Sequence, residues 1–113
     1  MNDESLVDAA VYRELQDAAG ADFAAELVGT FLEEAPAMLA VLHSSHAAGA
    51  ADPFRRAAHS LKSNSQTFGA MKLAEAARAL ELGGLAAADA QALGQLQALY
   101  SRSAQALQAL AHD

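Results

Sequence analysis

Apolar residues recur along most of the chain at intervals of three and four positions, which is the period of an amphipathic α-helix. Glycine and proline interrupt this pattern and divide it into five segments. We expect helices over about residues 8–18, 22–47, 52–68, 70–82 and 87–111. The first is short, and the other four are long with short connections. The predicted fold class is therefore all-α, an antiparallel four-helix bundle with a short additional N-terminal helix.

Individual residues mark several of the expected helix ends. Asp8 is a candidate N-cap for the first helix, and Gly49 is a candidate stop for the second. Asp52 is the expected N-cap of the third helix, with Pro53 at its first position. Pro36 lies inside the second segment and is expected to kink or interrupt it, because proline removes one helical hydrogen bond.

Each expected helix carries an apolar stripe that should face the core. In the second segment the stripe consists of Phe23, Leu27, Phe31, Met38 and Leu42. In the third it consists of Phe54, Ala57, Ala58, Leu61, Ser65 and Phe68.

Composition narrows the class of protein. The chain has 113 residues, so we expect one domain over 1–113. It contains no cysteine, which excludes disulfides, thiolate metal sites and a cysteine nucleophile. The net charge of −7 disfavours nucleic acid as a partner. The N-terminus lacks the features of a signal peptide and no apolar run approaches a membrane span, so we expect a cytoplasmic protein without membrane contact.

One histidine lies away from the core stripe of the third helix. On a helical wheel His59 is about 160° from Leu61, nearly opposite the core. A lone helical histidine is usually a core or a solvated surface residue, but the wheel disfavours the first reading, and the neighbours disfavour the second. Cations beside an imidazole favour its neutral, nucleophilic form and suit an anion placed on the ring. The outward neighbours at helical contact spacing are Arg55, Lys62, Ser63 and Gln66.

The stretch AHSLKSNSQTFGAMKLAEAARALE, residues 58–81, resembles the signature of the histidine phosphotransfer (HPt) domain family. The resemblance extends over essentially the whole helical layout and includes FLEEAPAML in the second helix. It implies that His59 is the phospho-acceptor and that Lys62 steadies the phosphoryl group. Ser63 takes the position of a small residue, often glycine, that admits the partner. Glu81 falls where the family often has a glutamine that contacts the imidazole, and here it would accept from a ring N–H.

The chain departs from the family at one further position. Some relatives carry an arginine where this sequence has Leu85, and Arg55 is a candidate substitute. Gln66 is a further candidate, since it faces outward with His59.

The resemblance also implies a phosphoryl carrier without kinase activity of its own. Its expected partners are response-regulator receiver domains of a bacterial-type phosphorelay, and a hybrid sensor histidine kinase is a further candidate. The partner receiver would supply Mg²⁺, so this chain is expected to need no cofactor or metal. A monomer is expected, because this class is usually monomeric and the acidic surface favours that state.

Three other readings remain beside this one. The segment could be the phospho-acceptor helix of a histidine kinase, but Ser60 and Asn64 stand where that family has an acid and a proline. The chain could be a helical adaptor that docks on a receiver or an enzyme without accepting phosphate. His43 and His46 could bind a metal at their i, i+3 spacing, although a solvated pair is the simpler expectation.

Overall fold

The computed structural model describes residues 6–112, so residues 1–5 and 113 of the expected domain lie outside the described part. The described residues form helices and contain no strand, which confirms the all-α prediction. The elements are α1 (Ala9–Ala19), α2 (Ala21–Ala48), α3 (Ala51–Thr67), α4 (Met71–Gly83), the 3₁₀-helix η2 (Gly84–Ala87) and α5 (Ala90–Ala111).

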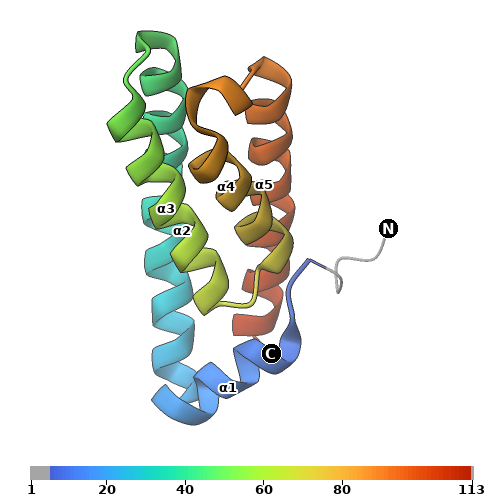
Figure 1. The fold of residues 1–113 in the computed structure, drawn as a ribbon. Helices are drawn as coiled ribbons and strands as arrows, with labels where there is room; N and C mark the ends of the chain where they lie inside the picture. The colour runs from blue at the N-terminus through green and yellow to red at the C-terminus, as the bar shows by residue number, and fades with distance from the viewer. Residues whose placement is uncertain (1–5, 113) are drawn as a thin grey trace.

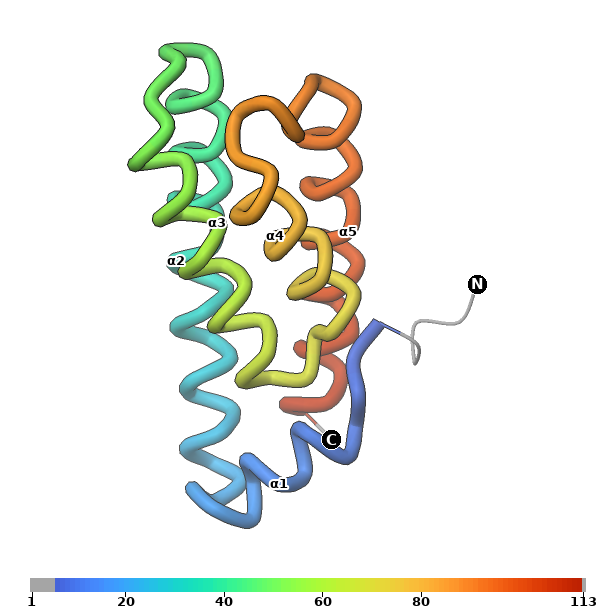
Figure 2. The backbone as a smooth tube through the Cα atoms, in the orientation of Figure 1, coloured from blue at the N-terminus to red at the C-terminus, as the bar shows by residue number. Residues whose placement is uncertain are grey.

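The four long helices pack side by side, and α1 crosses one end of them (Figure 1). Successive helices run in opposite directions, and the backbone trace shows α2 against α3, α4 beside α3, and α5 closing the ring onto α2 (Figure 2). The molecule measures 41 × 27 × 19 Å. At about 1.5 Å per residue, the 28 residues of α2 span its full length.

The core contains the stripe expected for the third helix. Phe54, Ala57, Ala58, Leu61 and Ser65 of α3 are buried, as is Phe68 directly after it. The ring of Phe68 stacks on that of Phe31 with centroids 5.4 Å apart, and Phe31 meets the edge of Tyr100 at 6.3 Å. These aromatic contacts connect α2, α3 and α5, and they leave the opposite side of α3 facing solvent.

The stripe expected for α2 was wrong at Phe23, whose side chain is 51% exposed. The buried positions recur at intervals of three or four residues: Ala24, Val28, Phe31, Ala35, Leu39, Leu42 and Ser45. Phe23 lies about 100° away from this line on the helix, and a large apolar side chain there has no facing helix to pack against. Leu27 and Met38, also expected in the core, lie half-buried at its edge.

Pro36 does not interrupt α2, which is continuous from Ala21 to Ala48. Proline has no N–H, so the carbonyl of Leu32 loses the helical donor that residue 36 would supply. The hydroxyl of Tyr100 donates to this carbonyl instead, over 3.4 Å. A side chain of α5 thus compensates in part for the missing backbone bond, which explains why the helix tolerates the proline.

Two of the expected helix boundaries agree with the structure, and the expected start of the third helix differs. Asp8 caps α1 by accepting from the amide of Ala10 at 2.9 Å, and Gly49 ends α2 with a φ of 68°. Asp52 does not cap α3, which begins at Ala51 after an Ala50 N-cap. Pro53, expected at the first position of this helix, is its third residue.

The last helix begins later than expected. Residues 84–87 form η2, and α5 begins at Ala90 rather than near residue 87. Asp89 caps it, because its carboxylate accepts from the amide of Ala92 at 2.7 Å. An aspartate at this position stabilises a helix start, which separates the alanine-rich stretch into two elements.

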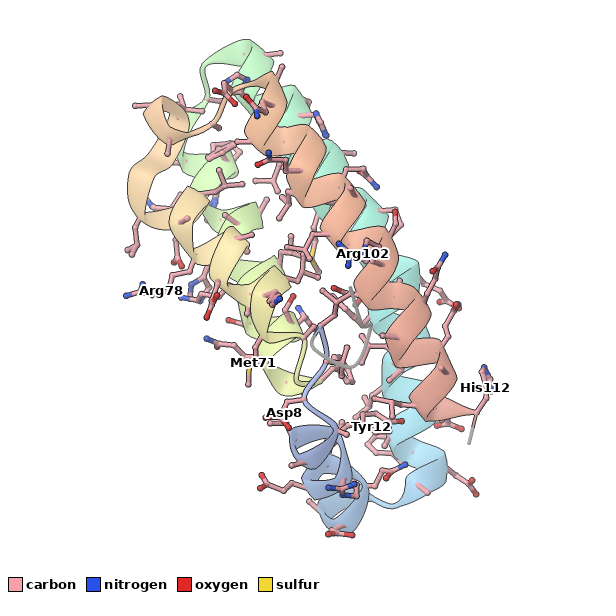
Figure 3. All side chains as sticks on the ribbon, turned by 90° about the vertical axis from the view of Figure 1, so that its right-hand side faces the viewer. Asp8, Tyr12, Met71, Arg78, Arg102 and His112 are labelled. Carbon is pink, nitrogen blue, oxygen red and sulfur yellow. The ribbon has the colours of Figure 1, made fainter. Side chains whose placement is uncertain are left out.

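α1 is attached to the turn between α3 and α4. The amide of Asp8 donates to the carbonyl of Gly69 at 2.8 Å, and Tyr12 is buried (Figure 3). Gly69 has a φ of 83°, and a Cβ there would lie 2.7 Å from the carbonyl oxygen of Asp8. Only glycine fits this close crossing. Val11 and Leu15 of α1 are half-buried against this end of the bundle.

None of the described helices is both long and apolar enough to cross a membrane.

Candidate functional site

His59 lies in the middle of α3, and its side chain is 58% exposed. Its neighbours Ala58 and Leu61 are fully buried. The core stripe therefore holds the helix so that the imidazole projects outward, as the helical wheel predicts. The ring is available to a partner molecule without any rearrangement of the bundle.

A single carboxylate of α4 binds two side chains of α3. Oε2 of Glu81 lies 2.6 Å from Nδ1 of His59, and Oε1 lies 2.7 Å from Nζ of Lys62. His59 and Lys62 are three positions apart, so they project from adjacent turns of one helix. α3 and α4 pack against each other, and each has a small, fully buried residue, Ala58 and Ala77 respectively. This packing brings Glu81 to the two side chains.

The contact fixes which nitrogen of His59 is free. An ionised carboxylate accepts hydrogen bonds only, so Nδ1 of the neutral ring carries the proton and donates to Glu81. The other nitrogen, Nε2, then has its lone pair available. The pKa of Glu81 is lowered by the hydrogen bond from Lys62 and next by that from His59, which outweigh partial burial. Glu81 is therefore the anion of the site at neutral pH.

Lys62 is less exposed than the wheel suggests. Its side chain is only 19% exposed, and that of Glu81 is 16% exposed. α4 packs along this flank of α3, so the aliphatic part of Lys62 is covered and its ammonium group reaches Glu81. Wheel geometry alone does not show on which flank a neighbouring helix lies.

The structure places the other candidate residues less centrally. Ser63 is half-buried, one turn after His59, and Gln66 is exposed one turn further on. Arg55 pairs with Asp52 of the same helix at 2.9 Å rather than with a residue of the site. Leu85, at the position where some relatives have arginine, lies half-buried in η2. His59, Lys62 and Glu81 thus form the polar contacts of the site, with Arg55 and Gln66 outside them.

Sequence analysis did not anticipate the ion pair between Lys62 and Glu81. The sequence shows their opposite charges, but the two residues lie in different predicted helices, so no spacing within one helix pairs them. The ion pair forms because α4 packs on α3 in the tertiary structure.

The remaining histidines show no metal-binding arrangement. No group of three potential ligands occurs among residues 6–112. His46 packs its ring against Phe54 with centroids 6.3 Å apart, whereas His43 is exposed. The carboxylates of Glu33 and Glu34 lie on the exposed face of α2.

An antiparallel helical bundle with an exposed imidazole, one nitrogen of which is bound by a carboxylate, has the features of a phosphoryl carrier. Comparison with protein families agrees: the family model described as Hpt domain matches residues 26–112. The chain belongs to the Hpt domain family. Hpt domains are phosphocarriers in two-component phosphorelays, where they interact with receiver domains of response regulators. Comparisons with curated proteins and with solved structures gave no significant match.

Proposed function

We propose that this chain accepts a phosphoryl group on His59 from the aspartate of one receiver domain and passes it to the aspartate of another. The observation that carries the proposal is the exposed imidazole whose Nδ1 is bound to Glu81. That contact leaves Nε2 as the nucleophilic nitrogen of a ring that is 58% exposed. It is the arrangement that in-line attack on an incoming phosphoryl group requires.

The transfer requires no co-reactant from this chain. The Nε2 lone pair forms a bond to phosphorus as the bond between phosphorus and the aspartate oxygen breaks, and the aspartate leaves as a carboxylate. The phosphorylated ring then carries a positive charge with its proton still on Nδ1. Glu81 lies 2.6 Å from that nitrogen and stabilises this cation. The reverse sequence delivers the group to the second receiver, and Mg²⁺ is supplied by the receivers.

Lys62 has a second role in this proposal. Its ammonium group has three N–H donors, and one of them binds Oε1 of Glu81, which lies 2.7 Å from Nζ. The remaining donors can bind phosphoryl oxygens on His59, one turn away on the same helix. Ser63 is small and therefore allows the partner to approach His59. Arg55 and Gln66 have secondary roles, outside the contacts among His59, Lys62 and Glu81.

The test is phosphoryl transfer from a phosphorylated receiver domain to the wild-type chain and to His59→Gln. We expect an acid-labile, base-stable label on the wild type and none on the variant. The exposed position of His59 means that the variant should keep its melting temperature, which circular dichroism checks. Equal labelling of both proteins would rule out His59 as the acceptor.

The same experiment separates a carrier from an adaptor. A pure adaptor would bind the receiver and remain unlabelled, whereas a carrier is labelled and then discharged by a second receiver. We further propose a cytoplasmic, monomeric carrier, either free or within a hybrid sensor kinase, since its partners are receiver domains.

A further inference from the structure

A hollow lies between α2 and α5, on helices other than those that carry the candidate site. It has a volume of about 290 Å³. Val28 and Leu32 of α2 and Ala111 of α5 give it an apolar lining, and Glu33 and His112 add polar groups. Figure 3 shows His112 at the end of α5, beside the first half of α2. None of the lining residues belongs to α3 or α4, so a ligand in this hollow leaves the candidate site accessible.

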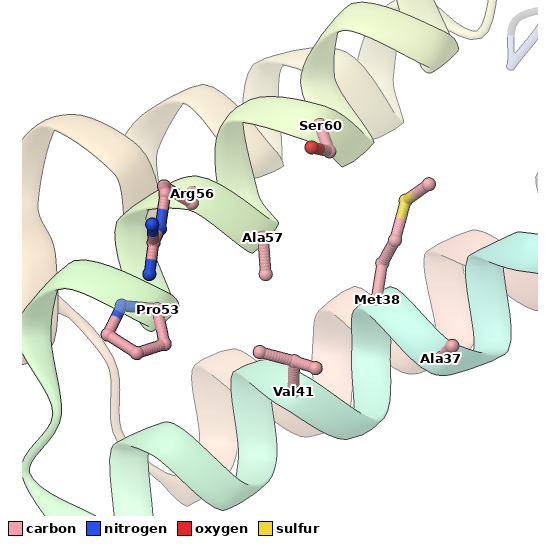
Figure 4. Close-up of a pocket in the computed structure, with 7 residues that line it drawn as sticks. All are labelled: Ala37, Met38, Val41, Pro53, Arg56, Ala57 and Ser60. Atoms are coloured by element: carbon pink, nitrogen blue, oxygen red, sulfur yellow. The ribbon is translucent and has the colours of Figure 1, made fainter.

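This hollow differs in charge from two others on the described surface. The hollow between α2 and α3 contains Arg56 and no carboxylate (Figure 4). The hollow beside α4, η2 and α5 has no charged lining residue. The hollow between α2 and α5 contains Glu33 and neither lysine nor arginine. Of the three, it is the one that suits a ligand with both apolar and cationic groups.

The negative charge extends along α2 beyond the hollow. Asp22, Glu26 and Glu33 are spaced i, i+4 and i+11, so they lie on one line along the helix. Residues 21–34 contain four carboxylates and no lysine or arginine, and none of these carboxylates forms an ion pair within residues 6–112. Five of the seven Lys and Arg residues of the chain lie on α3 and α4. A basic segment is therefore attracted to this side of α2, and an acidic one is repelled.

Gly29 leaves room on the same line of α2. It is exposed between Glu26 and Glu33, inside a helix, where glycine is less stable than alanine. A Cβ added at Gly29 would have no other atom within 4 Å, so packing within the described chain does not require glycine. A helix position without a side chain allows a second backbone to approach closely. Gly29 thus marks a place where another chain can lie against α2.

The length of the hollow indicates the form of the ligand. Its α2 lining extends from Ala25 to Glu33, which is about 12 Å along the helix. Apolar residues at positions i, i+4 and i+7 of a second helix span about 10.5 Å. An amphipathic helix packed along the hollow can therefore place three such residues against its lining.

We propose that the hollow between α2 and α5 binds a basic amphipathic helix of another protein. The apolar residues of that helix pack on Leu32 and Ala111, and its lysines or arginines pair with Glu33 and Glu26. The proposal does not depend on phosphoryl transfer, because it uses no residue of α3 or α4. Its consequence is attachment: the chain can stay bound to a second protein while His59 remains accessible.

Synthetic peptides test this chemistry. The probe is a fluorescein-labelled peptide of about 18 residues, long enough to form a helix, with leucines on one face and lysines beside them. One control peptide has glutamates in place of the lysines, and another has the same composition with the leucines spread around the helix. Fluorescence anisotropy with the wild-type chain should give both controls a Kd at least about tenfold higher. Equal binding of the basic peptide and its rearranged control would show attraction by net charge alone and would overturn the proposal.

The charge contact is tested by a matched pair of substitutions. Glu33→Gln should raise the Kd of the basic peptide at least about threefold, because it removes the carboxylate of the hollow. Glu75→Gln removes the same charge from the exposed face of α4 and should change Kd much less. Equal effects of the two substitutions would contradict a contact at Glu33.

Gly29 provides a test in which stability and binding change in opposite directions. Gly29→Gln should raise the melting temperature by a few degrees, because glutamine is the better helix former. It should also raise the Kd of the basic peptide at least about fivefold, because the side chain occupies the space of the ligand. Gly94→Gln on α5, also with no atom within 4 Å of an added Cβ, should raise the melting temperature and keep Kd. An equal Kd for the two variants would overturn the proposal.

The position of the peptide is read from amide shifts of the ¹⁵N-labelled chain. The largest shifts should fall on residues 25–33 and 108–112, and His59→Gln should keep the wild-type Kd. Largest shifts around Arg56 would place the peptide in the hollow between α2 and α3 and would overturn the assignment. If the hollow between α2 and α5 is covered by a second copy of this chain, sedimentation would show a dimer that the peptide dissociates. That result would also overturn it.

Discussion

Glu81 binds the imidazole of His59 from a different helix, with its Oε2 2.6 Å from Nδ1. The same carboxylate binds Lys62, so one acidic residue determines the orientation of both α3 side chains at the site. The charge of the site and the available nitrogen of His59 both depend on α4. Several measurable consequences arise from this dependence.

Substitution of Glu81 should alter the tautomer of His59. Glu81→Ala removes the acceptor at Nδ1, and we expect a mixture of ring tautomers and transfer slowed about tenfold. Glu81→Gln retains an acceptor oxygen and should be affected less. Long-range nitrogen–proton NMR spectra of the ring report the tautomer without any partner. Glu75→Gln, on the exposed face of the same helix, is the control, and a wild-type tautomer in Glu81→Ala would contradict the positioning role.

Removal of the Lys62 charge should slow transfer while the fold is kept. Lys62→Met retains an aliphatic side chain in the partly covered position, so its melting temperature should stay within about 4 °C of wild type. Transfer should fall about tenfold because phosphoryl oxygens lose a cationic donor. The matched control is Lys72→Met, which removes an exposed lysine of α4. Wild-type transfer by Lys62→Met would show that Lys62 serves only to bind Glu81.

The Glu81 carboxylate should make stability dependent on acid pH. Its pKa in the folded protein is below the ordinary value of 4.5, first because of Lys62 and then because of His59. The stabilisation is complete above that ordinary value and is lost as the pH falls through the lowered one. The wild type should therefore melt above Glu81→Gln at pH 6, and the difference should shrink as the pH falls below 4.5 towards the lowered pKa of Glu81. A difference that stayed constant down to pH 3 would contradict this linkage.

The attachment of α1 should depend on the absence of a side chain at residue 69. Gly69→Ala introduces a Cβ 2.7 Å from the carbonyl oxygen of Asp8 at a φ of 83°. We expect a loss of about 2–4 kcal/mol, or about 10 °C in melting temperature. Gly49→Ala has a φ of 68° with no atom within 4 Å of the added Cβ, so it isolates the backbone strain. It should cost about 1 kcal/mol. Equal losses would mean that the contact with α1 adds nothing.

The fold was predictable because its signals are local. Apolar periodicity and glycine positions located every long helix, and the stripe of α3 predicted both the buried Phe54 and the exposed His59. The errors occurred where local rules competed. Asp89 begins α5 after a separate 3₁₀ turn in a run that reads as continuous helix, and Phe23 has an apolar side chain without a facing partner.

The candidate site was only partly predictable. The resemblance to the family indicated Glu81 as a contact of the imidazole, and the structure brings the two together. The pairing of Arg55 with Asp52 and of Lys62 with Glu81 depends on side-chain reach and on the position of α4. None of these follows from the periodicity of a single helix.

The pairing of Lys62 with Glu81 also determines the resting charge beside His59. With a neutral imidazole, the ammonium group and the carboxylate cancel, so an arriving phosphoryl group meets no excess of positive charge. A strongly cationic site would bind the phosphoryl group tightly and oppose its departure. A site whose charges cancel binds the phosphoryl group only weakly, both when it arrives and when it leaves. Weak binding suits a protein that passes the group on to a second receiver.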